Sequence, residues 1–437
     1  MELAETAARA DLRRQLASDL EEARKRTHHL LEPLDDERLT VQFDPLMSPP
    51  VWDYAHIGAF EELWLVRQLS AAPPMLEDSL ERTYNALDTP RVARGKVKLL
   101  NRAETLAYLD EVRHRALALL EEVDLDADDR LLRDGFLYDL VIQHEHQHDE
   151  TILQELQLMP GEYLSNLPSA PGGRPVQSDM VVIPAGRYPI GSDLHEPYDN
   201  EHPRHEVELA SFRIDRFPVT NGDFLAFMAD GGYSREELWN RDGWDWKMTF
   251  GTGAPEYWFD QEGIWFTRRY GQTVPMEPQL PVAHVCYFEA DAYARWSGKR
   301  LPSEAEWEVS ASWDPVEKRQ RRYPWGDAPP TPELANLDQA LFGSTAIGAY
   351  PKGASGFGCE QMLGDVWEWT SSDFLPYPGF EAYPYTEYSE PFFGSTFKVL
   401  RGGSWATRPR VARNTFRNWD HPIKRQIFAG LRCAASG

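Results

Sequence analysis

The sequence has little cysteine, and this limits the kind of protein it can be. Its 437 residues include three cysteines, Cys286, Cys359 and Cys433, which lie far apart and form neither a CxxC pair nor a zinc-finger spacing. An odd number of distant cysteines is not a disulfide framework. A reducing cytosol therefore fits this composition best.

Basic residues and long apolar runs are also scarce. There are 45 Lys and Arg against 70 Asp and Glu, a formal charge of -25, which repels nucleic acid and anionic membranes. No window approaches 18 uninterrupted apolar residues, and the first residues, Met1 to Glu5, lack the basic and apolar regions of a secretory signal. We expect a cytoplasmic protein of two or three domains, with no nucleic-acid or membrane partner.

The most specific feature that is present is the stretch His144-Glu145-His146-Gln147-His148, inside an apolar helical pattern. Residues four apart lie on one helix face, so His144 and His148 can bind one cation, whereas His146 points elsewhere. The same letters form the HExxH signature of zinc proteases. The motif therefore predicts a metal site and leaves both the metal and the chemistry open.

Residues 1–164 have the periodicity of a four-helix bundle. The expected helices cover 12–31, a stretch that follows Ser48-Pro49-Pro50 with Ser48 as the N-cap, 103–123, and about 131–158. Trp52, His56, Phe60 and Trp64 share one face of the second helix, so the bundle can present His56 to the histidine pair. We expect a crossover loop over 67–102 and an interdomain linker over 165–177.

Residues 178–437 have a different texture, with short strands, many tryptophans, and frequent Gly and Pro. This composition indicates an α+β domain. Short helices are expected over 282–296 and 303–310, and Ser303 with Glu306 predicts a capping box.

Six motifs make this second domain resemble the formylglycine-generating-enzyme (sulfatase-modifying factor) fold, which is related to C-type lectins. They are Ile190-Gly191-Ser192, Phe217-Pro218-Val219-Thr220-Asn221, Lys299-Arg300-Leu301-Pro302-Ser303-Glu304-Ala305-Glu306-Trp307-Glu308, Tyr323-Pro324-Trp325-Gly326, Gly364-Asp365-Val366-Trp367-Glu368-Trp369 and Leu400-Arg401-Gly402-Gly403-Ser404-Trp405. The cysteine pair that holds copper in the true formylglycine-generating enzymes is not matched here. The resemblance therefore implies the fold without that activity.

The whole chain resembles the ergothioneine-biosynthesis sulfoxide synthases, in which a DinB-like four-helix bundle is fused to such a domain. The resemblance rests on Pro45-Leu46-Met47-Ser48-Pro49, Trp52-Asp53-Tyr54-Ala55-His56-Ile57-Gly58, His144-Glu145-His146-Gln147-His148-Asp149-Glu150-Thr151 and Phe416-Arg417-Asn418-Trp419-Asp420-His421-Pro422-Ile423. It implies an iron(II)- and O2-dependent reaction that joins a thiol sulfur to the imidazole C2 of hercynine, the trimethyl betaine of histidine, and gives a sulfoxide.

The resemblance also implies roles for individual residues. His56, His144 and His148 match the iron ligands, Tyr385 matches a proton donor, Gln147, Tyr388, Asn418 and Trp419 match hercynine contacts, and Arg91, Arg94, Asp420 and Lys424 match contacts to the thiol substrate γ-glutamylcysteine. Taken singly, most of these residues are more readily explained as packing or solvated side chains.

Lys424 stands where close relatives have arginine. It keeps the charge and loses the two-pronged geometry of a guanidinium group, so the preference between γ-glutamylcysteine and cysteine stays open. We expect Arg425 to be available as a substitute. We further expect His146 to be a surface or outer residue, and Glu145 to orient a ligand or its helix neighbour and not to act as a protease base.

Three alternatives remain. A selenosugar could replace the thiol on the same scaffold, although the presence of both Arg91 and Arg94 argues against it. A zinc hydrolase would use HExxH, yet no third ligand follows at the metzincin spacing. A pure binding module is the third possibility, because many lectin-like domains only bind, but the histidine-bearing bundle argues against that role.

Overall fold

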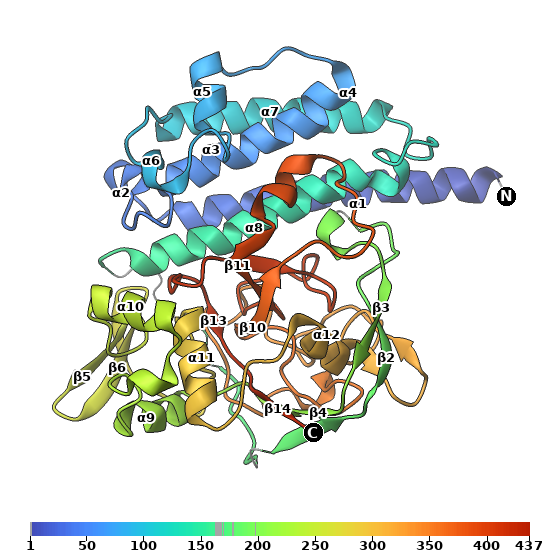
Figure 1. Cartoon of the computed structure of the whole chain (residues 1–437). Helices are drawn as coiled ribbons and strands as arrows, with labels where there is room; N and C mark the ends of the chain where they lie inside the picture. Colours follow the sequence, from blue (N-terminus) through green and yellow to red (C-terminus); the bar gives the residue numbers. More distant parts are fainter. Residues whose placement is uncertain (1, 162–167, 169, 177–178, 197) are drawn as a thin grey trace. The chain divides into compact units, whose positions relative to one another are not determined.

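The computed structural model describes residues 2–161, 168, 170–176, 179–196 and 198–437, shown in Figure 1. The chain divides into two compact units, a helical unit of Met1–Tyr163 with His195–Tyr198, and a second unit of Leu164–Leu194 with Asp199–Gly437. The sequence did not predict that residues 195–198 belong with the helices. Of the predicted linker, residues 165–167, 169 and 177 lie outside the described residues. Arg174, within the described part, donates to Glu360 and to the Gly348 carbonyl of the second unit.

The helical unit is built on four long helices that run roughly alongside one another (Figure 1). Its helices are α1 (Glu2–Leu31), α2 (Asp36–Thr40), α3 (Pro50–Glu61), continued by the π-helical η1 (Glu62–Arg67) and by α4 (Gln68–Ser70), then α5 (Asp78–Thr83), α6 (Arg91–Arg94), α7 (Arg102–Glu122), the short 3-10 turn η2 (Arg133–Gly135) and α8 (Phe136–Leu158).

Several elements differ from the sequence-based expectation, including α1, which begins at Glu2 and not at residue 12. The N-cap residue of α3 is Pro49, whereas the hydroxyl of Ser48 accepts a hydrogen bond from Arg94 Nη1 at 2.9 Å. Helix α8 begins at Phe136 and not near residue 131, because Asp134 and Gly135 have left-handed backbone angles that no helix continues through. The expected loop over 67–102 contains α5 and α6, so Arg91 and Arg94 lie on a one-turn helix.

One buried ring of charges joins the four long helices. Arg24 of α1, Glu61 of α3, Arg113 of α7 and Glu145 of α8 alternate in sign, and the N–O distances around the ring are 2.7, 2.6, 3.2 and 2.8 Å. Each long helix therefore contributes one charged residue, and the net charge of the ring is zero. Breaking such a buried pair typically costs about 3–5 kcal/mol, because one charge is left uncompensated.

The second unit is an α+β domain built of small sheets. Strands β1 (Met180–Ile183), β4 (Phe212–Asp215) and β14 (Ala434–Ser436) form one sheet, and the order β12 (Asn418–Asp420), β11 (Gly394–Arg401), β10 (Trp367–Phe374), β13 (Ala429–Gly430) forms another. The remaining strands are β2 (Gly186–Ile190), β3 (His205–Leu209), β5 (Trp258–Gln261), β6 (Ile264–Arg269), β7 (Gln272–Pro275), β8 (Trp313–Asp314) and β9 (Arg319–Gln320).

Its helices are α9 (Asn221–Ala229), α10 (Arg241–Phe250), α11 (Tyr287–Trp296) and α12 (Glu304–Ser312), with short 3-10 turns η3 (Asp199–Glu201), η4 (Glu236–Leu238), η5 (Pro351–Gly353), η6 (Thr386–Tyr388) and η7 (Glu390–Phe392). The predicted capping box is present, since Ser303 caps α12 and Glu306 bonds back to it. Trp307 of α12 is fully buried and donates to Glu368 at 2.7 Å. All three cysteines are buried free thiols. No helix among the described residues is long and apolar enough to cross a membrane.

Candidate metal centre and substrate-binding residues

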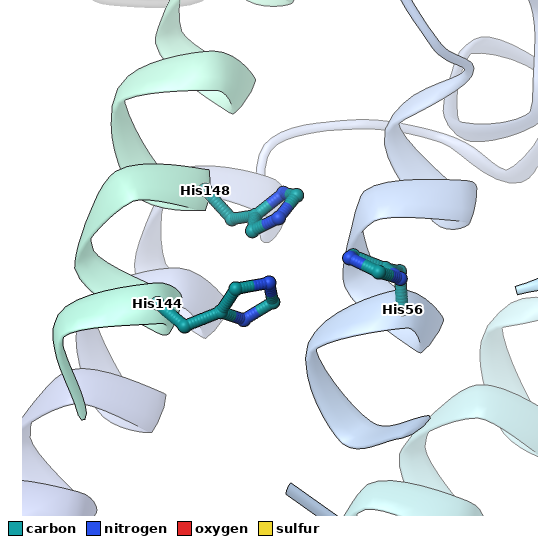
Figure 2. A group of neighbouring side chains, drawn as sticks. All are labelled: His56, His144 and His148. Atoms are coloured by element: carbon teal, nitrogen blue, oxygen red, sulfur yellow. The ribbon is translucent and has the colours of Figure 1, made fainter. Parts of the chain in front are cut away.

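Three histidines from two helices point toward one another in the helical unit (Figure 2). His56 comes from α3, and His144 and His148 come from successive turns of α8. Their ring centroids are 4.5 to 5.1 Å apart, and one nitrogen from each ring lies within 4.8 Å of the others. Metal–imidazole bonds are about 2.0–2.1 Å long, so small ring rotations bring the three nitrogens around one cation.

Hydrogen bonds orient two of the three rings. The Nδ1 atom of His56 lies 2.6 Å from the carbonyl oxygen of Tyr84, and the Nδ1 atom of His148 lies 2.7 Å from Asp53 Oδ1. Each Nδ1–H therefore donates outward, which leaves Nε2 as the ligand atom. Sequence reasoning missed both partners. Asp53 could have been noticed because it lies one turn before His56, whereas a backbone carbonyl leaves no signal.

The third histidine, His144, is held by packing. Its ring stacks on Phe60 with centroids 3.7 Å apart and planes 11° from parallel. Its Nδ1 atom is buried and has no hydrogen-bond partner among the described residues. A buried polar atom without a hydrogen-bond partner costs free energy, and a metal bound by this ring would change that cost.

Burial favours the neutral form of His56 and His144, which is the form that binds a metal. It lowers the pKa of His56 to about 3 and the pKa of His144 well below 6.5, and the proximity of the His148 ring lowers both further. Neutral imidazoles do not have to release a proton before they bind a cation. The donor set, its burial and its orientation all fit a metal ion.

A chain of polar groups extends behind His148. Burial raises the pKa of Glu155 well above its usual range, and the adjacent Asp53 carboxylate raises it further. Burial alone would raise the pKa of Asp53 too, but the hydrogen bond and charge of His148 lower it. These opposite shifts favour a proton on Glu155 beside an ionised Asp53, and Ser48 N–H donates to Glu155 Oε1 at 3.2 Å.

The two predicted arginines have different surroundings. Arg94 is buried, donates to Ser48 Oγ and the Thr89 carbonyl, and lies with its guanidinium carbon 3.3 Å from the centre of the Trp52 ring. Trp52 in turn stacks on His56, with centroids 4.7 Å apart. Burial lowers the pKa of Arg94 to about 10, so it remains charged at neutral pH. Arg91 is exposed.

The structure narrows two expectations about the neighbouring residues. Glu145 is completely buried and binds Arg24, Arg113 and Thr27, and the two arginines lower its pKa although burial alone would raise it. Glu145 therefore orients neighbouring helices and does not orient a metal ligand. A carboxylate that is enclosed in this way cannot serve as the base of a zinc hydrolase. His146 is buried, so it is not a surface residue, and it lies outside the three-histidine group.

Gln147, predicted to contact hercynine, accepts a hydrogen bond from Tyr198. The distance from Tyr198 Oη to Gln147 Oε1 is 2.8 Å, and Tyr198 is 1% exposed. This contact fixes the amide, with its NH2 group directed away from Tyr198. Tyr198 carries no sequence signal for this contact, because it lies far from helix α8 in the chain and in no motif.

In the second unit, the predicted aromatic residues form one cluster. The rings of Tyr385 and Tyr388 are 6.1 Å apart, and Tyr388 meets the edge of Trp419 at 5.7 Å. Trp419 lies on β12 beside Asn418 and stacks on Phe374 at 4.2 Å. Burial raises the pKa of Tyr385 well above 10, and the charges of Tyr388, Asp199 and Glu387 raise it further, so its phenol stays protonated.

The remaining two predicted residues bind each other. Lys424 Nζ lies 3.0 Å from Asp420 Oδ2, and both residues are buried. Arg425 cannot substitute for the missing arginine, because its guanidinium is bound by Glu289 and Glu256. The Asp420–Lys424 pair therefore places a carboxylate next to an ammonium group.

Comparison with known proteins agrees with both halves of this description. Residues 19–152 match the DinB superfamily, and residues 168–436 match the sulfatase-modifying factor enzyme 1-like domain. A hercynine oxygenase of Mycolicibacterium thermoresistibile is 48% identical over 97% of this chain and 95% of its own length. That of Mycolicibacterium smegmatis is 48% identical over 97% of this chain and 99% of its length, and that of Mycobacterium tuberculosis is 46% identical over 96% and 98%. The chain belongs to the hercynine oxygenase family, with a DinB-like helical region followed by a sulfatase-modifying-factor-like domain.

Proposed function

We propose that the protein is a non-haem iron(II)-dependent sulfoxide synthase that acts on hercynine and γ-glutamylcysteine. The reaction forms a bond between the thiol sulfur and the imidazole C2 and removes one hydrogen from each. One atom of O2 becomes the sulfoxide oxygen, and the other leaves as water. The two substrates supply all four electrons, so no external reductant is needed.

The observation that carries the proposal is the three-histidine centre in a chain whose relatives are named hercynine oxygenases. His56, His144 and His148 would hold iron(II) as a neutral set, leaving room for substrates and O2. Bound iron(II) would supply redox chemistry for O2 and a coordination position for the thiolate. A neutral ligand set suits a thiolate, because the sulfur then brings the negative charge that a carboxylate ligand brings elsewhere.

The protein's own residues would bind hercynine and move a proton. Gln147 and Asn418 offer amide groups to its carboxylate and imidazole, and Tyr388 and Trp419 offer aromatic faces to its quaternary ammonium group. Tyr385 Oη would donate a proton to the oxygen that accumulates negative charge. The phenol carries its proton at neutral pH, as a proton donor must.

Arg91, Arg94, Asp420 and Lys424 would hold the thiol substrate. Arginines suit its carboxylates, and the adjacent charges of Asp420 and Lys424 suit an amino-acid group that carries an ammonium and a carboxylate together. Free cysteine has the same group, so it is the second candidate thiol.

The test is anaerobic loading with iron(II), addition of hercynine with γ-glutamylcysteine or with cysteine, and then exposure to 18O2. Mass spectrometry should show a hercynine–thiol adduct with one heavy oxygen. The His56→Ala variant and zinc-loaded protein are the controls and should form none. Stoichiometric iron without an adduct from either thiol would refute the substrate assignment, and selenosugar donors would be tried next.

A further inference from the structure

One buried acid holds both ends of the loop that carries Tyr385 and Tyr388. We call residues 383–389 the tyrosine loop. Ser389 Oγ donates to Asp199 Oδ1 at 2.5 Å, and the backbone N–H of Tyr383 donates to Asp199 Oδ2 at 3.3 Å. Asn200 Nδ2 adds a bond to Ser389 Oγ at 3.1 Å. Asp199 and Asn200 are 3% and 1% exposed, and Ser389 is fully buried.

The residues beneath this contact are anchored. Glu201 is completely buried, accepts from both Arg413 and Thr415, and so fixes the chain two residues after Asp199. The carbonyl of Asn200 accepts from Arg417 Nη1 at 2.8 Å, and Arg417 directly precedes Asn418 of β12. The segment 199–201 is therefore a fixed base that also contacts the strand carrying the Asn418-Trp419 pair.

The tyrosine loop depends on this base for its conformation. It contains the single 3-10 turn η6 and no strand, and Thr386 and Glu387 at its tip are exposed. A 3-10 turn of three residues has poor hydrogen-bond geometry and little intrinsic stability. Contacts at the ends of such a loop therefore determine where its side chains lie.

Tyr198, the residue before Asp199, binds Gln147, which is another residue predicted to contact hercynine. Tyr198 belongs to the helical unit, where its hydroxyl donates to Gln147 Oε1. The peptide bond between residues 198 and 199 thus joins the residue that fixes Gln147 to the residue that fixes the tyrosine loop. Each hydrogen bond lies within one unit, and the link between them is covalent.

We propose that Tyr198 and Asp199 are positioning residues, in which Tyr198 orients Gln147 and Asp199, together with Asn200, holds Tyr385 and Tyr388 for the reaction. This inference rests on the proposed function, because it assigns these residues to the same substrates. A proton donor must lie within hydrogen-bond reach of its target, and a misplacement of about 1 Å can cost about 100-fold in rate.

Asp199→Ala in the iron-loaded enzyme tests the loop contact. We expect kcat to fall about 10- to 100-fold and KM for hercynine to rise, with KM for the thiol changed less than about twofold. Asp199→Asn should recover part of the loss, because an amide can still accept one of the two bonds. The matched control is Thr386→Ala, an exposed loop residue that does not contact Asp199, and it should behave as the wild type.

A double variant distinguishes positioning from general damage. If Asp199 acts through Tyr385, then Asp199→Ala should add little to the loss already caused by Tyr385→Phe. A full multiplicative loss in the double variant would overturn this route. If Asp199→Ala does not fold, Ser389→Ala removes the other partner of the same bond and takes its place.

Tyr198→Phe tests the second contact. Loss of one hydrogen bond should raise KM for hercynine about 3- to 10-fold and leave KM for the thiol unchanged. An unchanged KM for hercynine would overturn the role of Tyr198.

Hydrogen exchange gives a measurement that needs no turnover. Amides of residues 383–389 should exchange faster in Asp199→Ala than in the wild type, while the helical unit and the iron content stay the same. Unchanged exchange in the loop would refute the contact even if the enzyme is active. Conversely, wild-type enzyme that forms no sulfoxide would refute the proposed function, and the exchange result would still report on the loop.

Discussion

The carboxylate behind His148 should set the affinity of the metal centre, and Asp53→Asn tests this directly. Asp53 is 1% exposed and its Oδ1 atom lies 2.7 Å from His148 Nδ1. The amide keeps the volume and removes the charge, and its NH2 group can face Nδ1 and favour the wrong tautomer. Loss of such a partner typically weakens metal binding about 10- to 100-fold, or about 1.4 to 2.7 kcal/mol.

The assay is anaerobic competition for iron(II) between the protein and a chromophoric chelator. We expect the loss for Asp53→Asn to lie near the upper end of that range, because buried charges are poorly screened. Asp139→Asn is the matched control. Asp139 lies on α8, the helix of His144 and His148, accepts from Gln143 at 2.7 Å, and is not a partner of the three histidines. Iron(II) binding by Asp53→Asn within about threefold of wild type would refute the reasoning.

Three further predictions follow from the described contacts. Tyr385→Phe should keep iron and both substrates while losing most sulfoxide formation, with some thiol diverted to sulfinic acid; unchanged sulfoxide turnover, measured by mass spectrometry, would remove the phenol from the mechanism. Glu145→Leu should lower the free energy of unfolding by about 3–5 kcal/mol in urea titrations, because Arg24 and Arg113 each lose one of their two acidic partners and one positive charge is left uncompensated. Turnover per folded molecule should persist, and loss of turnover in the folded, iron-loaded variant would contradict this. Burial raises the pKa of Asp199 to about 6, although the hydrogen bonds of Ser389 and Tyr383 and the charge of His202 lower it. The unfolded chain therefore loses this proton at a lower pH than the folded chain. The stability of the wild type relative to Asp199→Asn should therefore fall as pH rises from about 4 to about 6, and a constant difference across urea titrations in that range would disprove the assignment.

Periodicity and family resemblance anticipated much of the fold. The i, i+4 spacing of His144 and His148 placed both rings on one face of a helix, and the family motif brought His56 into the same group. The division into a helical part and an α+β part followed from glycine, proline and tryptophan usage. These features are local in the chain or repeated along it, so they can be read from residue types alone.

Other features depend on tertiary contacts that carry no local signal. Helix α8 starts later than expected because two consecutive residues adopt left-handed angles, and Ser48 gives up its capping role to bind Arg94. The pKa of Glu155 is raised only because folding buries it next to Asp53, an acid that is far away in the sequence. Arg425 looked available in the sequence, yet two acids from elsewhere in the second unit bind it.

Helix α8 carries residues that stabilise the bundle and residues of the candidate metal centre on different faces. Glu145 closes the neutral ring of charges among the four long helices, while His144 and His148, on an adjacent face of the same helix, form the candidate metal centre. The four long helices are joined by ion pairs that involve none of the three histidines, so we expect the bundle to fold without a bound metal. Exchange of the histidines for other ligand sets should then leave the scaffold intact, which would make this unit a suitable host for engineered metal chemistry.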